Sequence, residues 1–589
     1  MKQSWLAVGI VLFCCLAIRS TGQDKQNSLP YDWSHRHVIF PAAASQARQV
    51  EIEKDPRFQQ QQLRRTLAQF DFEPHRGDPP EKSRFRQDWR EAVGVSPYVN
   101  GFAAYPAKYS FNVSNPTPDC LNDYVVYTVR DSSGGNLNVI AFNNLYVNNL
   151  GNGLCPGTTP AVLFAYNVSQ LGGVISSAAL SLDGTQIAFI ENAGSASQLH
   201  ILKWRAGDTS ATFPRPFNST PLANCAANGA LAPCEYSFTY TTSPSSFSAP
   251  YVDYTTDTAW VTDNSGHISA IHPVFTATPT TPPAVVSGYP LAPSTTFLTA
   301  PVFDSVSGNV FVADETKLYY IRTKSTSAGT CASGSPPCIG STSQTISGGA
   351  GAGLTFEAPI VDSTNGWVFE FAWSGPPYNG STIVQSNTTL STQNVANISG
   401  TTGGSSPTIM FTGTFDNAYY NNPASGKLYA CGENNAGHFG TLWAAGFTSA
   451  GMKTGTAGFG PLNLTSSNGS PGTTPVCSPL TEVYNQTAGK DYLYTGIASY
   501  CAFNGPAGGC IFSFDITNSF PSVPLASFNS PGGSSGIVID NVTGSLTSAT
   551  NMYYLSTMPP GTGAPCTVYT GGTNTTGNCA IKLTQSGLN

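Results

Sequence analysis

The chain has little charge and little histidine. Only 10% of its 589 residues are Asp, Glu, Lys or Arg, and seven are His. It has no P-loop, no H-E-x-x-H helix and no C-x-x-C pair, so we predict no metal site and no cofactor. From residue 96 onward it has 12 basic and 22 acidic residues, a net charge of −10. Such a surface repels nucleic acid, which we exclude as a partner.

Long apolar runs are also missing, with one exception at the start of the chain. Lys2 precedes an apolar run from Trp5 to Ile18, and small residues lead to a cleavage site after Gly22. The run is shorter than the roughly 20 residues that a membrane-spanning helix needs. We therefore predict a signal peptide at residues 1–22, with an uncleaved anchor as the alternative. The mature chain is expected to be secreted or extracytoplasmic (periplasm, cell surface or extracellular), without a membrane span.

The number of cysteines agrees with an extracytoplasmic location. Removing Cys14 and Cys15 from the 14 cysteines leaves 12, and an even number in an exported chain predicts disulfides. Four pairs are close neighbours around loop-forming residues, and the last two are assigned only by elimination. The predicted pairs are Cys225–Cys234, Cys331–Cys338, Cys501–Cys510, Cys566–Cys579, Cys120–Cys155 and Cys431–Cys477.

Residues 23–95 differ in composition from the rest, with 12 basic and 11 acidic residues between positions 24 and 95. Asp55 and Pro56 are typical of a helix start, and apolar residues follow at helical spacing. A second helix is predicted from Pro80, ending near Gly94. We expect a partly helical or disordered segment that packs on the main domain, or else docks on a partner. The apolar positions are Phe58, Leu63, Leu67 and Phe70 in the first helix and Phe85, Trp89 and Val93 in the second.

Two histidines in this segment are two residues apart. His35 and His37 would share one face of an extended strand, as two metal ligands can. Two ligands do not make a metal site. We therefore predict ordinary surface histidines.

From Ser176 onward one pattern returns seven times. A small residue or Pro leads into an apolar strand, then comes a turn with Asp or Asn four residues before Gly, then a second apolar strand. The clearest copies are 300–312 and 358–369. The turns lie at positions 184, 257, 308, 366, 426, 489 and 544, with a mean spacing of 60 residues.

This period, with short strands and many turn residues, predicts an all-β chain that folds as a seven-bladed β-propeller over residues 96–589. One of two early strands, 123–129 or 160–166, could complete the last blade beside 579–583 and close the ring. Alternatively, the early strands form a blade of their own, which makes eight blades.

The acidic residue of the turn has a structural explanation. Asp or Asn can accept hydrogen bonds from backbone N–H groups two residues on, and Gly adopts the positive φ of a tight hairpin. A ring of carboxylates that binds cations at the axis is the alternative. The residues concerned are Asp253, Asp304, Asp362 and Asp540.

The first copy of the repeat carries a resemblance to known blades. Leu180-Ser181-Leu182-Asp183-Gly184-Thr185, followed by Ile187-Ala188-Phe189, is similar to the S-x-D-G-x-x-hydrophobic blade of the TolB-like group. The chain from Ser176 to Leu583 resembles the secreted bacterial β-propeller repeat superfamily, with YVTN, NHL or TolB-like blades, and no specific characterised family within it. This resemblance implies a fold and not an activity.

Candidate site residues lie on loops that break the repeat. Glu433 and His438 are the catalytic candidates, while Trp443, His267 and His272 are the binding candidates. A carboxylate, an imidazole and aromatic rings suit carbohydrate binding or lyase chemistry.

These observations lead to two hypotheses of different classes. The first is a monomeric binding or scaffolding module for a glycan, a peptide or an envelope protein. The alternative is an extracellular polysaccharide hydrolase or lyase with a site at the propeller axis. A quinone-dependent dehydrogenase is disfavoured because the copies lack a regular tryptophan signature. An axial funnel lined by carboxylates and histidines would favour the enzyme, and a plugged axis would favour binding.

Overall fold

A computed structural model describes most of the chain, but not the predicted signal peptide. The described residues are 28–42, 46–67, 84–93, 97–98, 104–113, 118–131, 138–168, 173–174, 176–192, 195–208, 222–245, 248–346, 357–374, 380–398, 410–434, 439–466, 477–486, 488–503, 508–540, 550–556, 566–570, 573–577 and 579–586. No helix in these ranges is long and apolar enough to cross a membrane.

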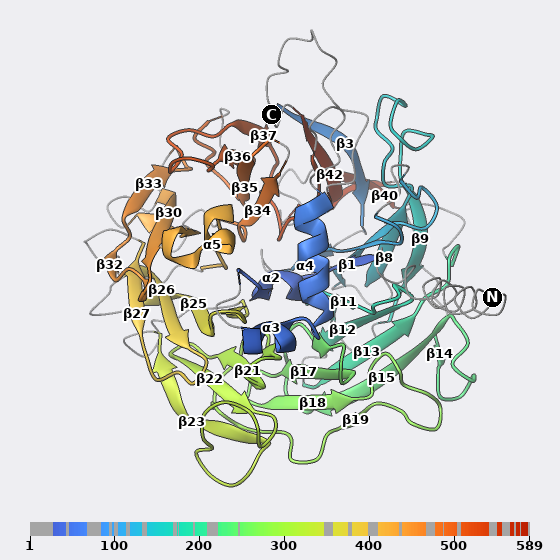
Figure 1. Ribbon diagram of the computed structural model, residues 1–589. Coiled ribbons are helices and arrows are strands. Elements are labelled where there is room, and N and C mark those ends of the chain that lie inside the picture. The colour runs from blue at the N-terminus through green and yellow to red at the C-terminus, as the bar shows by residue number, and fades with distance from the viewer. Residues whose placement is uncertain are drawn as a thin grey trace, which may run out of the picture.

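The described strands form a ring of eight sheets with at least four strands each, a β-propeller (Figure 1). Blades 1 and 2 contain β1 (Leu29–Tyr31), β5 (Ala107–Ser110), β6 (Tyr124–Thr128), β8 (Val139–Asn143) and β9 (Ala161–Tyr166), then β10 (Gly173–Val174), β11 (Ala179–Leu180), β12 (Gln186–Asn192), β13 (Ser197–Lys203), β14 (Ala223–Asn224) and β15 (Cys234–Thr241). Blades 3 and 4 contain β16 (Tyr251–Asp253), β17 (Thr258–Thr262), β18 (Ile268–His272) and β19 (Ala284–Val285), then β20 (Val302–Asp304), β21 (Asn309–Ala313), β22 (Lys317–Arg322) and β23 (Cys338–Thr345).

The second half of the ring is built in the same way. Blades 5 and 6 contain β2 (Val38–Ile39), β24 (Ile360–Asp362), β25 (Trp367–Ser374), β26 (Gly380–Asn387), β27 (Asn394–Asn397) and β32 (Gly455–Thr456), then β28 (Thr414–Phe415), β29 (Lys427–Asn434), β30 (Phe439–Thr448), β31 (Gly451–Met452) and β33 (Phe459–Asn463). Blades 7 and 8 contain β34 (Thr481–Asn485), β35 (Lys490–Ile497), β36 (Cys510–Asp515) and β37 (Ala526–Asn529), then β38 (Val538–Asp540), β39 (Thr550–Leu555), β42 (Cys579–Ser586) and β3 (Arg84–Ala92). Two small hairpin sheets pair β4 (Pro97–Tyr98) with β7 (Arg130–Asp131) and β40 (Cys566–Thr570) with β41 (Thr573–Gly577).

The predicted all-β propeller is confirmed, and the seven repeat copies lie in seven separate blades, 2 to 8. The early strands at 123–129 and 160–166 form blade 1 instead of completing the last blade. The eight-blade alternative therefore describes the whole ring, in which blade 1 precedes the repeat copies.

The prediction of a helix from Pro80 is wrong. Residues 84–92 form strand β3, which pairs antiparallel with β42 and completes the last blade. Positions four apart share one face of a strand as well as one face of a helix, so the spacing of Phe85, Trp89 and Val93 fits both. The strand that closes the ring therefore lies in the charged N-terminal segment.

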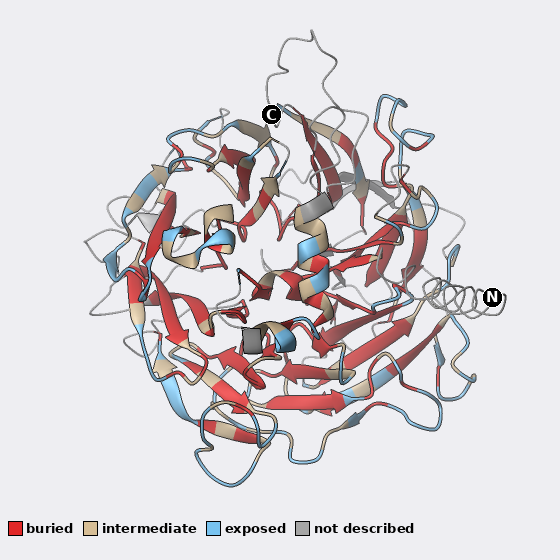
Figure 2. Ribbon diagram, in the orientation of Figure 1, coloured by how far each residue is buried: buried red, intermediate tan, exposed pale blue. Residues whose placement is uncertain are grey.

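Blades 8 and 1 meet through a buried core that closes the ring. Trp89 and Tyr553 of blade 8 pack with Val125 and Phe142 of blade 1. Similar apolar clusters fill the other junctions, and the strands are mostly buried while exposed residues gather in the outer loops (Figure 2).

The structural explanation of the turn carboxylates holds at three of the four positions. Asp253 Oδ1 accepts a hydrogen bond from Thr255 N at 3.0 Å, and Asp304 Oδ2 accepts one from Ser307 N at 2.9 Å. Asp362 Oδ1 accepts one from Asn365 N at 2.9 Å. The turn after Asp540 lies outside the described residues. Asp540 pairs with Lys108 Nζ at 3.0 Å, across the closing junction.

Five disulfides occur in the described part of the chain, and all five are predicted pairs. They are Cys120–Cys155, Cys225–Cys234, Cys331–Cys338, Cys431–Cys477 and Cys501–Cys510. Cys579 is also disulfide-bonded, but the side chain of Cys566 is outside the described part, so their pairing stays a prediction. Several disulfides indicate an oxidising environment.

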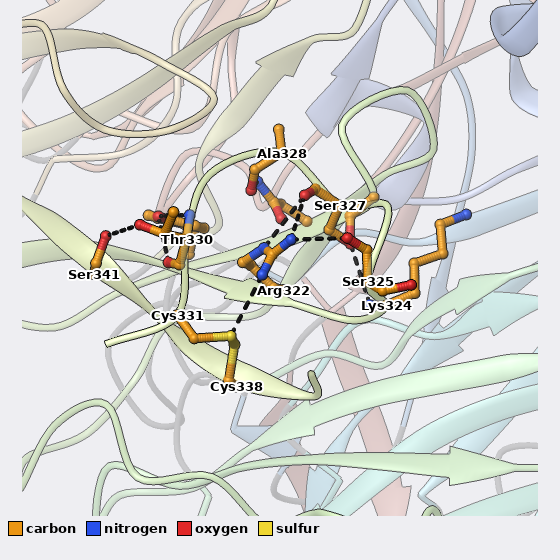
Figure 3. The surroundings of a disulfide bond; sticks show 12 residues. Arg322, Lys324, Ser325, Ser327, Ala328, Thr330, Cys331, Cys338 and Ser341 are labelled. Carbon is orange, nitrogen blue, oxygen red and sulfur yellow. Dashed lines mark hydrogen bonds between the residues drawn. A yellow bond between two sulfur atoms is a disulfide. The ribbon is translucent and has the colours of Figure 1, made fainter. Parts of the chain in front are cut away.

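The Cys331–Cys338 bridge closes a loop that one arginine also holds (Figure 3). Arg322 donates to the carbonyl oxygens of Ser325 and Ser327 at 3.0 and 2.8 Å, and its Nη1 lies 3.4 Å from the sulfur of Cys331. The loop therefore has a second anchor besides its disulfide.

We expect disulfide removal to cost more where the closed loop is longer. Cys431–Cys477 spans 46 residues and Cys331–Cys338 spans seven. Loop-closure entropy then predicts that the double serine variant of the longer loop loses about 1.5 kcal/mol more stability than that of the shorter loop. Denaturant midpoints of the two variants measure the difference, and equal losses would contradict the entropic account.

Candidate functional site at the propeller axis

The N-terminal segment fills the centre of the ring. Residues 28–67 carry β1, α2 (Ser34–His37), β2, α3 (Gln46–Ile52) and α4 (Pro56–Leu67), all of which lie inside the circle of blades (Figure 1). Strand β1 pairs with β5 of blade 1, and β2 pairs with β24 of blade 5. Because blades 1 and 5 face each other in a ring of eight, the chain crosses the axis. We call residues 28–67 the axial plug.

One polar network holds the plug against blade 2. Asp32 accepts hydrogen bonds from Ser34 Oγ at 2.6 Å and from Leu180 N at 2.9 Å, and its Oδ1 lies 3.0 Å from His35 Nδ1. His35 Nε2 lies 2.5 Å from Gln60 Oε1 of α4. Burial alone would raise the pKa of Asp32, but His35, Arg57 and the hydrogen bond from Ser34 lower it to about 2. Asp32 is therefore an ionised anchor.

A second network joins the plug to blades 1, 5 and 6. Glu357 accepts hydrogen bonds from Tyr105 OH at 2.5 Å and from Thr412 N and Oγ1 at 2.5 and 2.8 Å. His37 Nε2 lies 3.7 Å from the same carboxylate. Burial opposes ionisation of Glu357, yet His37 and these hydrogen bonds lower its pKa below the usual value. Both oxygens of the Glu357 carboxylate thus accept hydrogen bonds from neighbouring protein groups.

Helix α4 lies across the centre of the ring and is fixed by arginines at both ends. At its start, Arg57 Nη2 donates to Ser34 Oγ at 2.9 Å and to Val252 O at 2.8 Å. Near its end, Arg65 donates to Asn417 Oδ1 at 2.7 Å and pairs with Glu482 at 3.3 Å. The predicted helix start is confirmed, because Asp55 Oδ1 accepts a hydrogen bond from Arg57 N at 2.9 Å.

Two local patterns resemble hydrolase chemistry but lack its geometry. Ser34 donates to Asp32 and not to His35, and all three side chains are buried. Residues 532–536 match G-x-S-x-G. Its central Ser534 is buried, precedes strand β38 instead of a helix, and donates to Ser478 Oγ at 3.0 Å. Neither serine is bonded to a histidine base.

The prediction of surface histidines at positions 35 and 37 is wrong. Both belong to α2 and are buried in the plug, where their ring nitrogens face Asp32, Gln60, Pro359 and Glu357. A charged, polar segment suggests solvent exposure, but here its polar groups find partners on blades 2, 3, 5, 6 and 7. In the described part of the chain, no group of three or more His, Cys, Asp or Glu side chains is placed to hold a metal.

Of the sequence-predicted site residues that the structure describes, His267 and His272 lie in blade 3 and Trp443 lies in blade 6. His267 and His272 flank β18 at its two ends. His267 Nδ1 lies 3.1 Å from Asp263 Oδ2, and its side chain is 41% exposed. Trp443 is buried and donates to Thr441 Oγ1 at 2.9 Å, so its ring contributes to the core. The side chain of Glu433 and all of His438 lie outside the described part of the chain.

A buried charge cluster that the sequence does not reveal lies in blade 2. His200 is held between Glu191 Oε2 and Glu235 Oε2, each 3.0 Å from one ring nitrogen, and its ring stacks on Phe189. His200 and Glu191 are at most 1% exposed. Cross-strand pairing brings these residues together, because β12, β13 and β15 are neighbours. The cluster is inaccessible to a substrate and has a structural role.

We expect this cluster to make stability depend on pH. Burial would lower the pKa of His200, but the two carboxylates raise it to about 9. An unfolded histidine titrates near 6.5, so the stabilisation is complete below about pH 6.5 and is lost as the pH rises through 9. The wild type should lose about 3 kcal/mol over this interval, whereas His200→Gln should lose much less. Denaturant titrations at several pH values test this; equal slopes for both proteins would refute it.

Comparisons with known proteins do not assign a family to the chain. No family model and no curated protein matches the sequence. BamB from Moraxella catarrhalis is 11% identical, with 85% of this chain and 99% of that chain covered and a TM-score of 0.41. Prolyl oligopeptidase B from Galerina marginata is 9% identical, with 87% of this chain and 59% of that chain covered and a TM-score of 0.35.

Proposed function

We propose that this protein is an extracytoplasmic glycan-binding module, a propeller whose centre recognises a ligand and performs no catalysis. The supporting observation is the axial plug. Propeller enzymes assemble their sites from several blades around the axis. Here β1, β2 and α2 occupy that position, and the carboxylates beside them, Asp32 and Glu357, accept hydrogen bonds from protein donors.

Two further features support the location and the ligand. The predicted signal peptide at residues 1–22 and the five disulfides fit an exported protein. Tyrosines and arginines gather on the plug and around it, and both residue types suit sugars, since rings stack on sugar faces and guanidinium groups bind their oxygen atoms.

A glycan array together with polysaccharide-degradation assays tests this function on the purified mature protein. We expect saturable binding of a glycan with no release of reducing ends or unsaturated products. Turnover of any polymer would reject the non-catalytic binding module and favour the alternative hypothesis, a hydrolase or lyase. Absence of binding to every glycan on the array would also reject the proposal.

A further inference from the structure

The arginines of the plug fall into two classes. Arg57 and Arg65 are fixed by hydrogen bonds to side-chain or backbone oxygens. Arg36 and Arg64 are half-buried and contact aromatic rings instead: their guanidinium carbons lie 4.9 Å from the Tyr105 ring centroid and 3.6 Å from that of Tyr31. The guanidinium groups of the second class are held by ring contacts and, in the described part of the chain, not by hydrogen bonds.

Arg36 has an unmet requirement for an acceptor. Its Nη1 is buried, and no acceptor in the described chain takes a hydrogen bond from it. A buried N–H group without a partner is unfavourable and calls for an oxygen atom. Tyr31, Tyr105 and Glu357 all lie within electrostatic reach of this guanidinium group.

The nearby carboxylates cannot supply that acceptor without losing their own partners. Glu357 is bound by Tyr105, Thr412 and His37. Glu482 is paired with Arg65. In the described part of the chain, Arg36 and Arg64 therefore contact aromatic rings at the centre of the ring, and neither guanidinium group donates a hydrogen bond.

We propose that Arg36 and Arg64 bind the anionic group of an acidic glycan, a carboxylate or a sulfate. A guanidinium fork fits either oxyanion in a bidentate geometry, and the tyrosines beside it offer ring and hydroxyl contacts to the sugar. This site rests on the proposed glycan-binding function and names its ligand class. Since the whole chain carries a net charge of −7, general attraction does not explain binding of a polyanion.

Calorimetric titration of the mature protein with three probes tests the site: oligogalacturonate for the carboxylate, sulfated dextran oligomers for the sulfate, and unmodified dextran oligomers as the neutral control. We expect at least one acidic probe to bind at least tenfold more tightly than the neutral probe, and more weakly as salt is added. R36Q and R64Q should each weaken acidic binding about tenfold. R90Q, which removes an exposed arginine on the outer strand β3, should leave it unchanged.

The melting temperature separates recognition from structural support. If Arg36 binds a ligand, R36Q and the wild type have the same melting temperature in the absence of glycan. An acidic probe then raises the melting temperature of the wild type but not that of R36Q. R36K, which keeps the charge but not the fork, should fold and bind with intermediate affinity. Equal binding of acidic and neutral probes, or unchanged acidic binding by R36Q and R64Q, overturns the anionic site and leaves glycan binding intact. Absence of any glycan binding rejects the proposed function itself.

Discussion

Arg57→Ala is expected to destabilise the protein by about 5 kcal/mol, the upper end of the range for breaking a buried ion pair. The guanidinium carbon lies 4.4 Å from the ring centroids of both Tyr251 and Tyr254. Its positive charge also interacts with the buried carboxylates of Asp32 and Asp55. Alanine would leave these two carboxylates in the core without a guanidinium group beside them. The denaturant midpoint of the variant measures the loss.

Two further variants separate charge from geometry at this position. Arg57→Lys keeps the positive charge but cannot reach Ser34 and Val252 together, so its loss should be intermediate. Arg48→Ala removes another plug arginine, a half-buried one that donates to the backbone carbonyl of Thr364 at 2.9 Å. We expect a smaller loss there, and equal losses for Arg48→Ala and Arg57→Ala would contradict the charge argument.

The repeat and the disulfides could be predicted because their signals are local. Each turn places its Asp or Asn, its Gly and two apolar runs within about a dozen residues, and five cysteine pairs follow from spacing or elimination. The closing strand β3 was missed for a physical reason. Its apolar residues recur every four positions, a spacing that a helix and a strand share.

The axial site was beyond the reach of sequence patterns because its partners are distant along the chain. Tyr105 and Glu357 are 252 residues apart, and Arg57 and Val252 are 195 apart. Charged residues are rarely buried, so a segment with 12 basic residues suggests an exposed arm. Its residues 28–67 become a plug because a ring of eight blades leaves an axis to fill and acceptors to satisfy on opposite sides.

Closure of the ring depends on the same segment, and Trp89→Ala should open it. Trp89 is 3% exposed, and its Nε1 donates to Leu145 O of the first blade at 3.2 Å. Its ring centroid lies 5.9 Å from that of Phe142 and 6.0 Å from that of Tyr553, so one side chain joins blades 1 and 8. Removing a buried tryptophan costs about 4 kcal/mol.

The location of the damage distinguishes a closing role from simple loss of core. Trp373→Ala removes a tryptophan of comparable burial from β25 of blade 5, away from the closing junction. Hydrogen exchange should accelerate in β3, β42 and blade 1 for Trp89→Ala, and in blade 5 for Trp373→Ala. Trp89→Phe should restore most of the protection, because it keeps an aromatic ring at the junction. If Trp89→Ala and Trp373→Ala loosen the same strands, Trp89 does not close the ring, and β3 is only one more outer strand.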